Sequence, residues 1–177
     1  MINSNPTQTL NRLVLLSLVL IILGFITYSN SLSNPFIYDD KLNIEQNPHL
    51  RSLAFLPKLV SPEYPYLFRE KTYRPVVTLT YLANYLIAQL NPFYWRIINL
   101  AIHIANAILL FTIIRLIIGR NGLAFIVSAL FLVHPVNAQV INCISFREDP
   151  LCLFFCLSAF IFYLQKKPNL SRYLLSL

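Results

Sequence analysis

Residues 95–118 read WRIINLAIHIANAILLFTIIRLII and form a long apolar segment. A helix needs about 20 residues to cross the roughly 30 Å hydrocarbon core of a bilayer, so this segment predicts a membrane-spanning helix. Four polar residues within it are spaced three, four and three apart and share one helical face: Arg96, Asn99, His103 and Asn106. Polar groups that face lipid are costly. The stripe therefore predicts a face turned to the bundle interior or to an outward-opening cavity, with simple interhelical hydrogen bonding as the alternative.

The composition excludes an ordinary soluble domain. Of 177 residues 56% are hydrophobic and only 12% are charged, and the mean hydropathy is +0.60, whereas soluble chains carry about 25% charged residues. The same numbers exclude disorder, which needs low hydrophobicity. The net charge of +7 does not indicate a nucleic-acid partner, because the basic residues are scattered among apolar stretches. The three cysteines have no metal-ligand spacing. The chain is predicted to be an all-α polytopic membrane protein.

The charges decide which apolar runs cross the membrane. The runs are Leu13–Tyr28, Pro75–Leu90, 95–118, Leu123–Val133 and Leu151–Leu164. If all five cross, with the amino terminus inside, the basic residues near the carboxyl terminus lie outside, against the tendency of cytoplasmic loops to be rich in Lys and Arg. If Pro75–Leu90 does not cross, the inner side holds Arg12, Arg115, Arg120, Lys166, Lys167 and Arg172, and all seven acidic residues lie outside. We therefore predict about four transmembrane helices plus one juxtamembrane helix; a cleaved signal peptide is the alternative for the first run.

This arrangement divides the chain into seven parts. We expect a cytoplasmic tail and first span (1–29), an extracytoplasmic loop (30–94) with the juxtamembrane helix (75–90), a second span (95–118), a cytoplasmic turn and third span (119–134), a second extracytoplasmic loop (135–150), a fourth span (151–165), and a cytoplasmic tail, expected to be truncated (166–177). The first loop is proline-rich. We expect it to hold few core residues and to lie on the membrane surface.

Two acidic groups lie in the outer loops. Asp39 and Asp40 are adjacent, so one pKa should rise unless a cation or hydrogen bonds compensate. Such a pair can act as a general base, bind a cation, or cap a helix. Glu148 and Asp149 follow Arg147 and precede Pro150. Asp149 can cap a helix that begins at Pro150, and it can also face a cavity.

Basic residues of the first loop are candidates for binding phosphate. Arg74, in the sequence Tyr73-Arg74-Pro75, lies where the loop returns to the membrane. Arginine binds phosphate oxygens by bidentate hydrogen bonds. A salt bridge with Glu70 or contact with anionic headgroups is the alternative.

Together these pieces resemble a known family. The ordered motifs are FIYDD (36–40), NP (47–48), YRP (73–75), YWRIINLAIHIANAILLF (94–111) and ALFLVHPVNAQVINCISFRED (129–149). They are similar to the amino-terminal part of the transmembrane and tetratricopeptide-repeat O-mannosyltransferases and their bacterial relatives, membrane glycosyltransferases of the GT-C fold. The resemblance covers roughly residues 13 to 165.

The resemblance implies a transferase that moves a sugar such as mannose from a polyprenyl-phosphate carrier to a hydroxyl acceptor, a protein or another molecule. It implies catalytic roles for Asp39, Asp40 and Asp149, with Asp39 favoured as the base. By analogy of position and chemistry, the residues that hold lipid phosphate or substrate are Arg74, Arg96, His103, His134, Arg147 and Glu148. No cofactor and no metal ligand are predicted, and a divalent-metal requirement stays open. The expected location is the inner membrane in a bacterium or the endoplasmic reticulum membrane in a eukaryote.

One departure from the family leaves other functions open. Relatives continue through more spans and usually a repeat domain, whereas this chain stops at Leu177. We therefore expect a fragment that is inactive alone. The alternatives are a non-catalytic membrane subunit or scaffold, and a piece of a transporter or flippase whose polar stripe lines a pathway.

Overall fold

The computed structural model describes residues 6–67 and 72–165, and this part of the chain is helical without a strand. Predictions for Glu70, Lys166, Lys167 and Arg172 lie outside the described residues. The α-helices are α1 (Pro6–Tyr28), α2 (Pro75–Ala88), α3 (Pro92–Ile118), α4 (Asn121–Val133), α5 (Ala138–Asn142) and α6 (Glu148–Gln165). Short turns of 3-10 or π helix connect them: Ser29–Ser31, Lys41–Glu45, Pro48–Arg51, Leu53–Val60, Tyr64–Leu67, Pro135–Asn137 and Ile144–Phe146.

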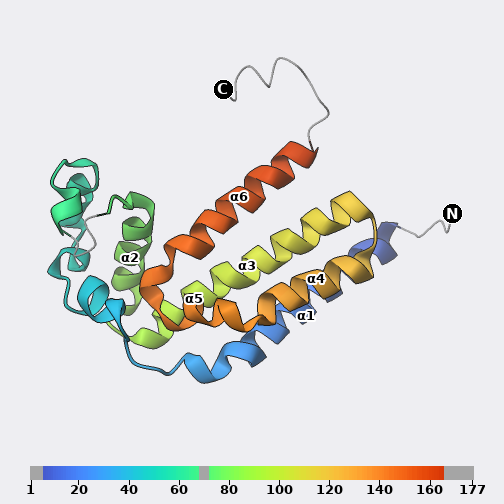
Figure 1. Ribbon diagram of the computed structural model, residues 1–177, viewed down its shortest axis with the longest axis horizontal. Coiled ribbons are helices and arrows are strands. Elements are labelled where there is room, and N and C mark those ends of the chain that lie inside the picture. The colour runs from blue at the N-terminus through green and yellow to red at the C-terminus, as the bar shows by residue number, and fades with distance from the viewer. Residues whose placement is uncertain (1–5, 68–71, 166–177) are drawn as a thin grey trace, which may run out of the picture.

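Helix α3 is the centre of the fold and packs against α1, α4 and α6 (Figure 1). Its sequence fixes both ends. Asn91 caps the start, where its side chain accepts a hydrogen bond from the Phe93 amide at 3.1 Å, and Pro92 suits the first helical position. Gly119 ends the helix in the left-handed conformation, with φ of 73°.

Helices α1 and α3 approach each other closely at one glycine. A Cβ atom added to Gly24 would lie 2.7 Å from Cγ1 of Ile104, closer than two carbons can pack. The absence of a side chain at Gly24 therefore leaves room for the side chain of Ile104.

The buried apolar residues of the described chain form two clusters. The bundle cluster lies among the long helices: Leu20, Tyr28, Leu32, Leu100, Ile104, Ala107, Phe111, Ala124, Leu132 and Ile141. The loop cluster lies at the end that holds α2: Phe36, Ile44, Leu50, Phe55, Leu59, Tyr64, Val77, Tyr81, Leu82, Trp95 and Ile144. The expectation that residues 30–94 hold few core residues is therefore wrong. Most of their buried apolar side chains, although dispersed along the sequence, pack together with Trp95, whereas Leu32 joins the bundle cluster.

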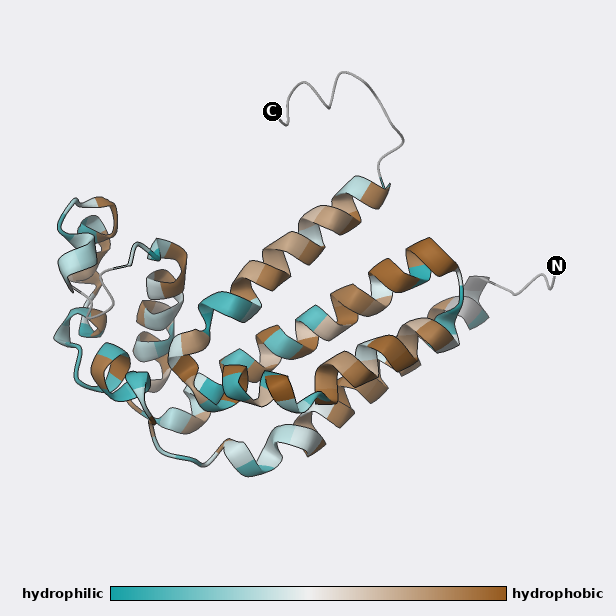
Figure 2. Cartoon of the chain, in the orientation of Figure 1, coloured by the Kyte–Doolittle hydropathy of each residue, from teal (hydrophilic) through white to brown (hydrophobic). Residues whose placement is uncertain are grey.

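Two described helices are long and apolar enough to cross a membrane, Leu10–Ser31 and Pro92–Ile118. Helix α4 and the segment Pro135–Asn142 form a pair bent by 48°, which makes a third candidate if the pair is one span. The predicted fourth span, Leu151–Leu164, lies in α6, which is not among these candidates and begins with two carboxylates. Apolar residues dominate the long helices, and hydrophilic residues gather at the end with α2 (Figure 2). The structure therefore supports a helical membrane protein with two or three candidate spans.

Candidate functional site

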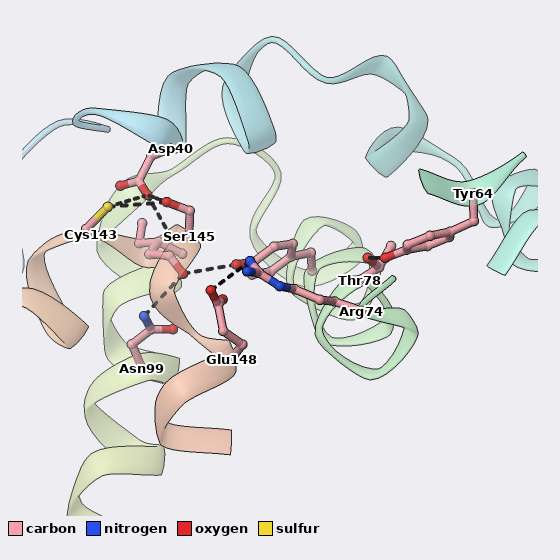
Figure 3. Close-up of polar contacts among 10 residues, drawn as sticks. Asp40, Tyr64, Arg74, Thr78, Asn99, Cys143, Ser145 and Glu148 are labelled. Carbon is pink, nitrogen blue, oxygen red and sulfur yellow. Dashed lines mark hydrogen bonds and ion pairs between the residues drawn. The ribbon is translucent and has the colours of Figure 1, made fainter. Parts of the chain in front are cut away.

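The carboxylate of Asp40 joins the two predicted outer loops. It is fully buried. Its Oδ1 accepts hydrogen bonds from the Ser145 amide at 2.8 Å and the Ser145 hydroxyl at 3.0 Å, and contacts the Cys143 thiol at 3.5 Å (Figure 3). Its Oδ2 lies 3.4 Å from the Ile37 amide. Hydrogen bonds to an ionised acceptor are the strong ones. Asp40 therefore holds the 36–40 stretch against residues 143–145.

Asp39 has the opposite environment, although it is the next residue along the chain. It is exposed. The preceding Tyr38 has a φ of 45° and is 82% exposed. The turn therefore directs one aspartate into the protein and leaves the other accessible to a ligand.

Arg147 ties the second loop to α2 and α3. It is fully buried, and its guanidinium donates to Asn99 Oδ1 at 2.6 Å and Asn84 Oδ1 at 2.8 Å. The Trp95 carbonyl accepts a further bond at 3.2 Å, and the guanidinium lies 4.9 Å from the centre of the Tyr81 ring. Burial lowers the pKa of Arg147 to about 10. Arg147 therefore stays cationic at neutral pH and adds a buried positive charge to this end of the fold.

The polar stripe of α3 faces the bundle interior, as the sequence predicts. All four side chains are buried, and each bonds a backbone carbonyl. Arg96 donates to Asn34, Pro35 and Asn142; Asn99 donates to Val140; His103 contacts Leu132; Asn106 donates to Pro150. These are the contacts of the interhelical hydrogen-bonding alternative. The stripe fixes the loop ends around α3.

Arg74 pairs with Glu148 across 74 residues of sequence. Its Nη1 lies 2.7 Å from Oε1 of Glu148, and both side chains are partly exposed (Figure 3). The pair lies in the wall of a small pocket whose other lining residues are Asn43, Tyr64, Thr72, Val77, Thr78, Tyr81 and Ser145. The Tyr64 and Thr78 hydroxyls are hydrogen-bonded to each other. The free space is about 30 Å³, which suits water rather than a sugar.

The other two predicted residues lie apart from these contacts. Asp149 is exposed in the first turn of α6, which begins at Glu148 and not at Pro150. His134 is exposed, and its Nδ1 accepts a hydrogen bond from the Val136 amide at 3.2 Å. Within residues 6–67 and 72–165 no group of three or more His, Cys, Asp or Glu side chains could hold a metal ion.

Sequence reasoning missed several residues that complete the site. Ser145 carries no motif of its own, and its position two residues before Arg147 is the only local signal. Asn84 and Thr80 are polar residues four apart in the apolar run of α2, a spacing that places both on one helical face. Thr80 contacts Arg147 through its carbonyl and hydroxyl oxygens. The polar face of α2 was therefore the signal in the sequence that could have identified Thr80 and Asn84 as partners of a buried side chain.

These features define a helical membrane protein in which buried arginines and an aspartate hold two acidic loops together. The chain is 31% identical over 143 residues to human Protein O-mannosyl-transferase TMTC1, across 77% of this chain and 16% of that protein. It is 30% identical to human Protein O-mannosyl-transferase TMTC3 over 84% of this chain and 17% of that protein. It is 27% identical to Protein O-mannosyl-transferase F38B6.6 of Caenorhabditis elegans, across 85% of this chain and 23% of that protein.

These similarities confirm the predicted resemblance: the chain is homologous to part of the proteins named protein O-mannosyl-transferases. The matched region spans only about a sixth to a quarter of the length of these relatives. No protein-family model and no solved structure matches the chain.

Proposed function

We propose that this chain is the part of a membrane glycosyltransferase that carries the general base, and that the enzyme moves a sugar from a polyprenyl phosphate to a hydroxyl group of a protein. The names of the relatives support sugar transfer, mannose as the sugar and a protein acceptor. The observation that carries the proposal is the Asp40–Ser145 contact, which holds exposed Asp39 next to the loop that leads to the carboxylates of α6.

The two aspartates have different roles in this proposal. An acceptor hydroxyl is a poor nucleophile, so a carboxylate that removes its proton lowers the barrier. Asp39 is the base, because it is the exposed member of the pair. Asp40 is a positioning residue, since its oxygens already accept hydrogen bonds inside the protein.

The leaving phosphate gains negative charge during transfer, so fixed cations lower the barrier. Arg74 is a partly exposed cation, and its ion pair with Glu148 can open so that phosphate replaces the carboxylate. Arg147 is fully buried and contributes its positive charge from within the protein. Arg96 and His103 hold loop carbonyls in place. Asp149 and His134 are exposed and available to the acceptor or donor.

The proposed setting follows from the candidate spans. The site lies at the end of α3 where the outer loops are predicted, so the sugar carrier enters from the extracytoplasmic leaflet. In a eukaryote this membrane is that of the endoplasmic reticulum, and in a bacterium the inner membrane.

The test measures sugar transfer by the whole protein that contains this chain, reconstituted in liposomes. Radiolabelled polyprenyl-phosphate mannose is the donor and a secreted protein domain is the acceptor. Asp39→Asn should lower kcat about 10² to 10⁴-fold, the usual contribution of a general base. Glu63→Gln is the matched control, because Glu63 is an exposed carboxylate of the same loop. A wild-type rate in Asp39→Asn would remove the proposed base.

A further inference from the structure

We propose that the ring of Tyr38 forms the platform on which the pyranose of the sugar donor stacks during transfer. This inference rests on the proposed function and extends it to Tyr38, the residue of the FIYDD motif that precedes the two aspartates and to which no role is assigned above. It assigns to Tyr38 the recognition of the sugar itself, as distinct from the lipid or the phosphate of the donor.

Both sides of Tyr38 are anchored. Phe36 is buried, and its ring packs edge-on against Trp95 with 6.2 Å between centroids. The carbonyls of Asn34 and Pro35 accept hydrogen bonds from Arg96. On the other side, Asp40 is held by Ser145. Of the three residues between Phe36 and Asp40, Ile37 is half-buried, and Tyr38 and Asp39 are exposed on a turn that is anchored at both ends.

The exposed position of Tyr38 requires an unfavourable backbone conformation. Its φ of 45° lies in the left-handed region, where a bulky side chain is uncommon. Glycine or asparagine adopts this conformation more readily. In addition, 82% of the tyrosine is exposed, so the ring gains little from burial in this chain. A strained residue that is held in place by its surroundings is a common feature of ligand sites.

The chemistry of the neighbouring groups points to a sugar. A pyranose has one face of C–H groups and a rim of hydroxyls. An aromatic ring offers the C–H face a flat, apolar surface, and an adjacent carboxylate accepts hydrogen bonds from hydroxyls. Tyr38 and Asp39 present these two groups side by side in the sequence, and both are exposed. The ring would hold the sugar beside the base that activates the acceptor.

The same exposed tyrosine could instead rest in the membrane interface, where tyrosines are enriched. The two roles differ in what the ring contacts. A platform contacts only the sugar, so its loss weakens binding of the donor and does not change binding of the sugar-free product. Loss of an interface anchor weakens binding of both molecules equally.

The experiment compares variants of the whole protein in liposomes. We measure KM for polyprenyl-phosphate mannose, KM for the acceptor protein, and Ki for polyprenyl phosphate without sugar. Tyr38→Asn removes the ring and suits the left-handed backbone, and Tyr38→Phe keeps the ring. Tyr66→Ala is the matched control, because Tyr66 is 78% exposed in the same loop.

We expect Tyr38→Asn to raise the donor KM at least tenfold while the product Ki and the acceptor KM change less than twofold. Tyr38→Phe and Tyr66→Ala should stay within threefold of wild type. The thermal midpoint of Tyr38→Asn should equal or exceed that of wild type, since the strain is relieved. An unchanged donor KM, or an equal rise in donor KM and product Ki, overturns the inference while the loss of activity in Asp39→Asn still supports the proposed function. Full activity in Asp39→Asn would refute both.

Discussion

Single substitutions of Asp39 and Asp40 should change the free energy of unfolding by different amounts, although the two residues have the same side chain. Asp40→Ala removes the buried carboxylate that accepts hydrogen bonds from the Ser145 amide and the Ser145 hydroxyl. Hydrogen bonds to a charged group contribute about 1.5–3 kcal/mol each. The two short bonds, at 2.8 and 3.0 Å, therefore predict a loss of about 3–6 kcal/mol in the free energy of unfolding.

Asp39→Ala is the matched control, because Asp39 is exposed. Surface substitutions away from special features usually change stability by less than about 0.5 kcal/mol. The loss in the free energy of unfolding for Asp40→Asn should lie between those for Asp40→Ala and Asp39→Ala. Its amide oxygen can still accept from Ser145, but its NH₂ group would face the Ile37 amide, which donates to Oδ2 in the native protein.

The assay is equilibrium unfolding of the purified chain in detergent micelles with increasing denaturant, followed by circular dichroism. The reasoning predicts the order of destabilisation Asp40→Ala, Asp40→Asn, Asp39→Ala. Equal losses in Asp39→Ala and Asp40→Ala would refute it, because they would mean that the Ser145 contacts contribute nothing.

Three further predictions concern other contacts. Gly24→Ala places a methyl group against Ile104 and should cost about 1–3 kcal/mol in the same unfolding assay, whereas Gly122→Ala, with open space around it, should not destabilise the chain. Burial raises the pKa of Cys143 from 9.0 to about 11, so the thiol contributes stability that is complete below pH 9 and is lost as the pH rises to 11; stability measured from pH 8 to 11 should fall less in Cys143→Ala than in wild type, and equal slopes would contradict this. Arg147→Met removes the donor to the Asn84 and Asn99 side-chain oxygens and should cost at least about 2 kcal/mol, since an unsatisfied buried group costs about 1–3 kcal/mol. Arg147→Lys should recover part of that loss, and a stable Arg147→Met would contradict the described network.

Local patterns in the sequence determined the helices and their faces. The α3 stripe has a period of 3.6, and this period placed all four polar side chains on the buried side. Asn91, Pro92 and Gly119 set the ends of that helix through interactions within a few residues. The resemblance to O-mannosyltransferases also depended on the order of motifs alone. Each of these inferences needs only contacts between residues that are close in the chain.

The tertiary structure decided what each charged residue does. Asp39 and Asp40 have the same side chain, and only packing against Ser145 buries one and exposes the other. Arg74 forms an ion pair with Glu148, which lies 74 residues further along the chain. Burial and charge pairing depend on distances between segments far apart in sequence, and no local pattern encodes those distances.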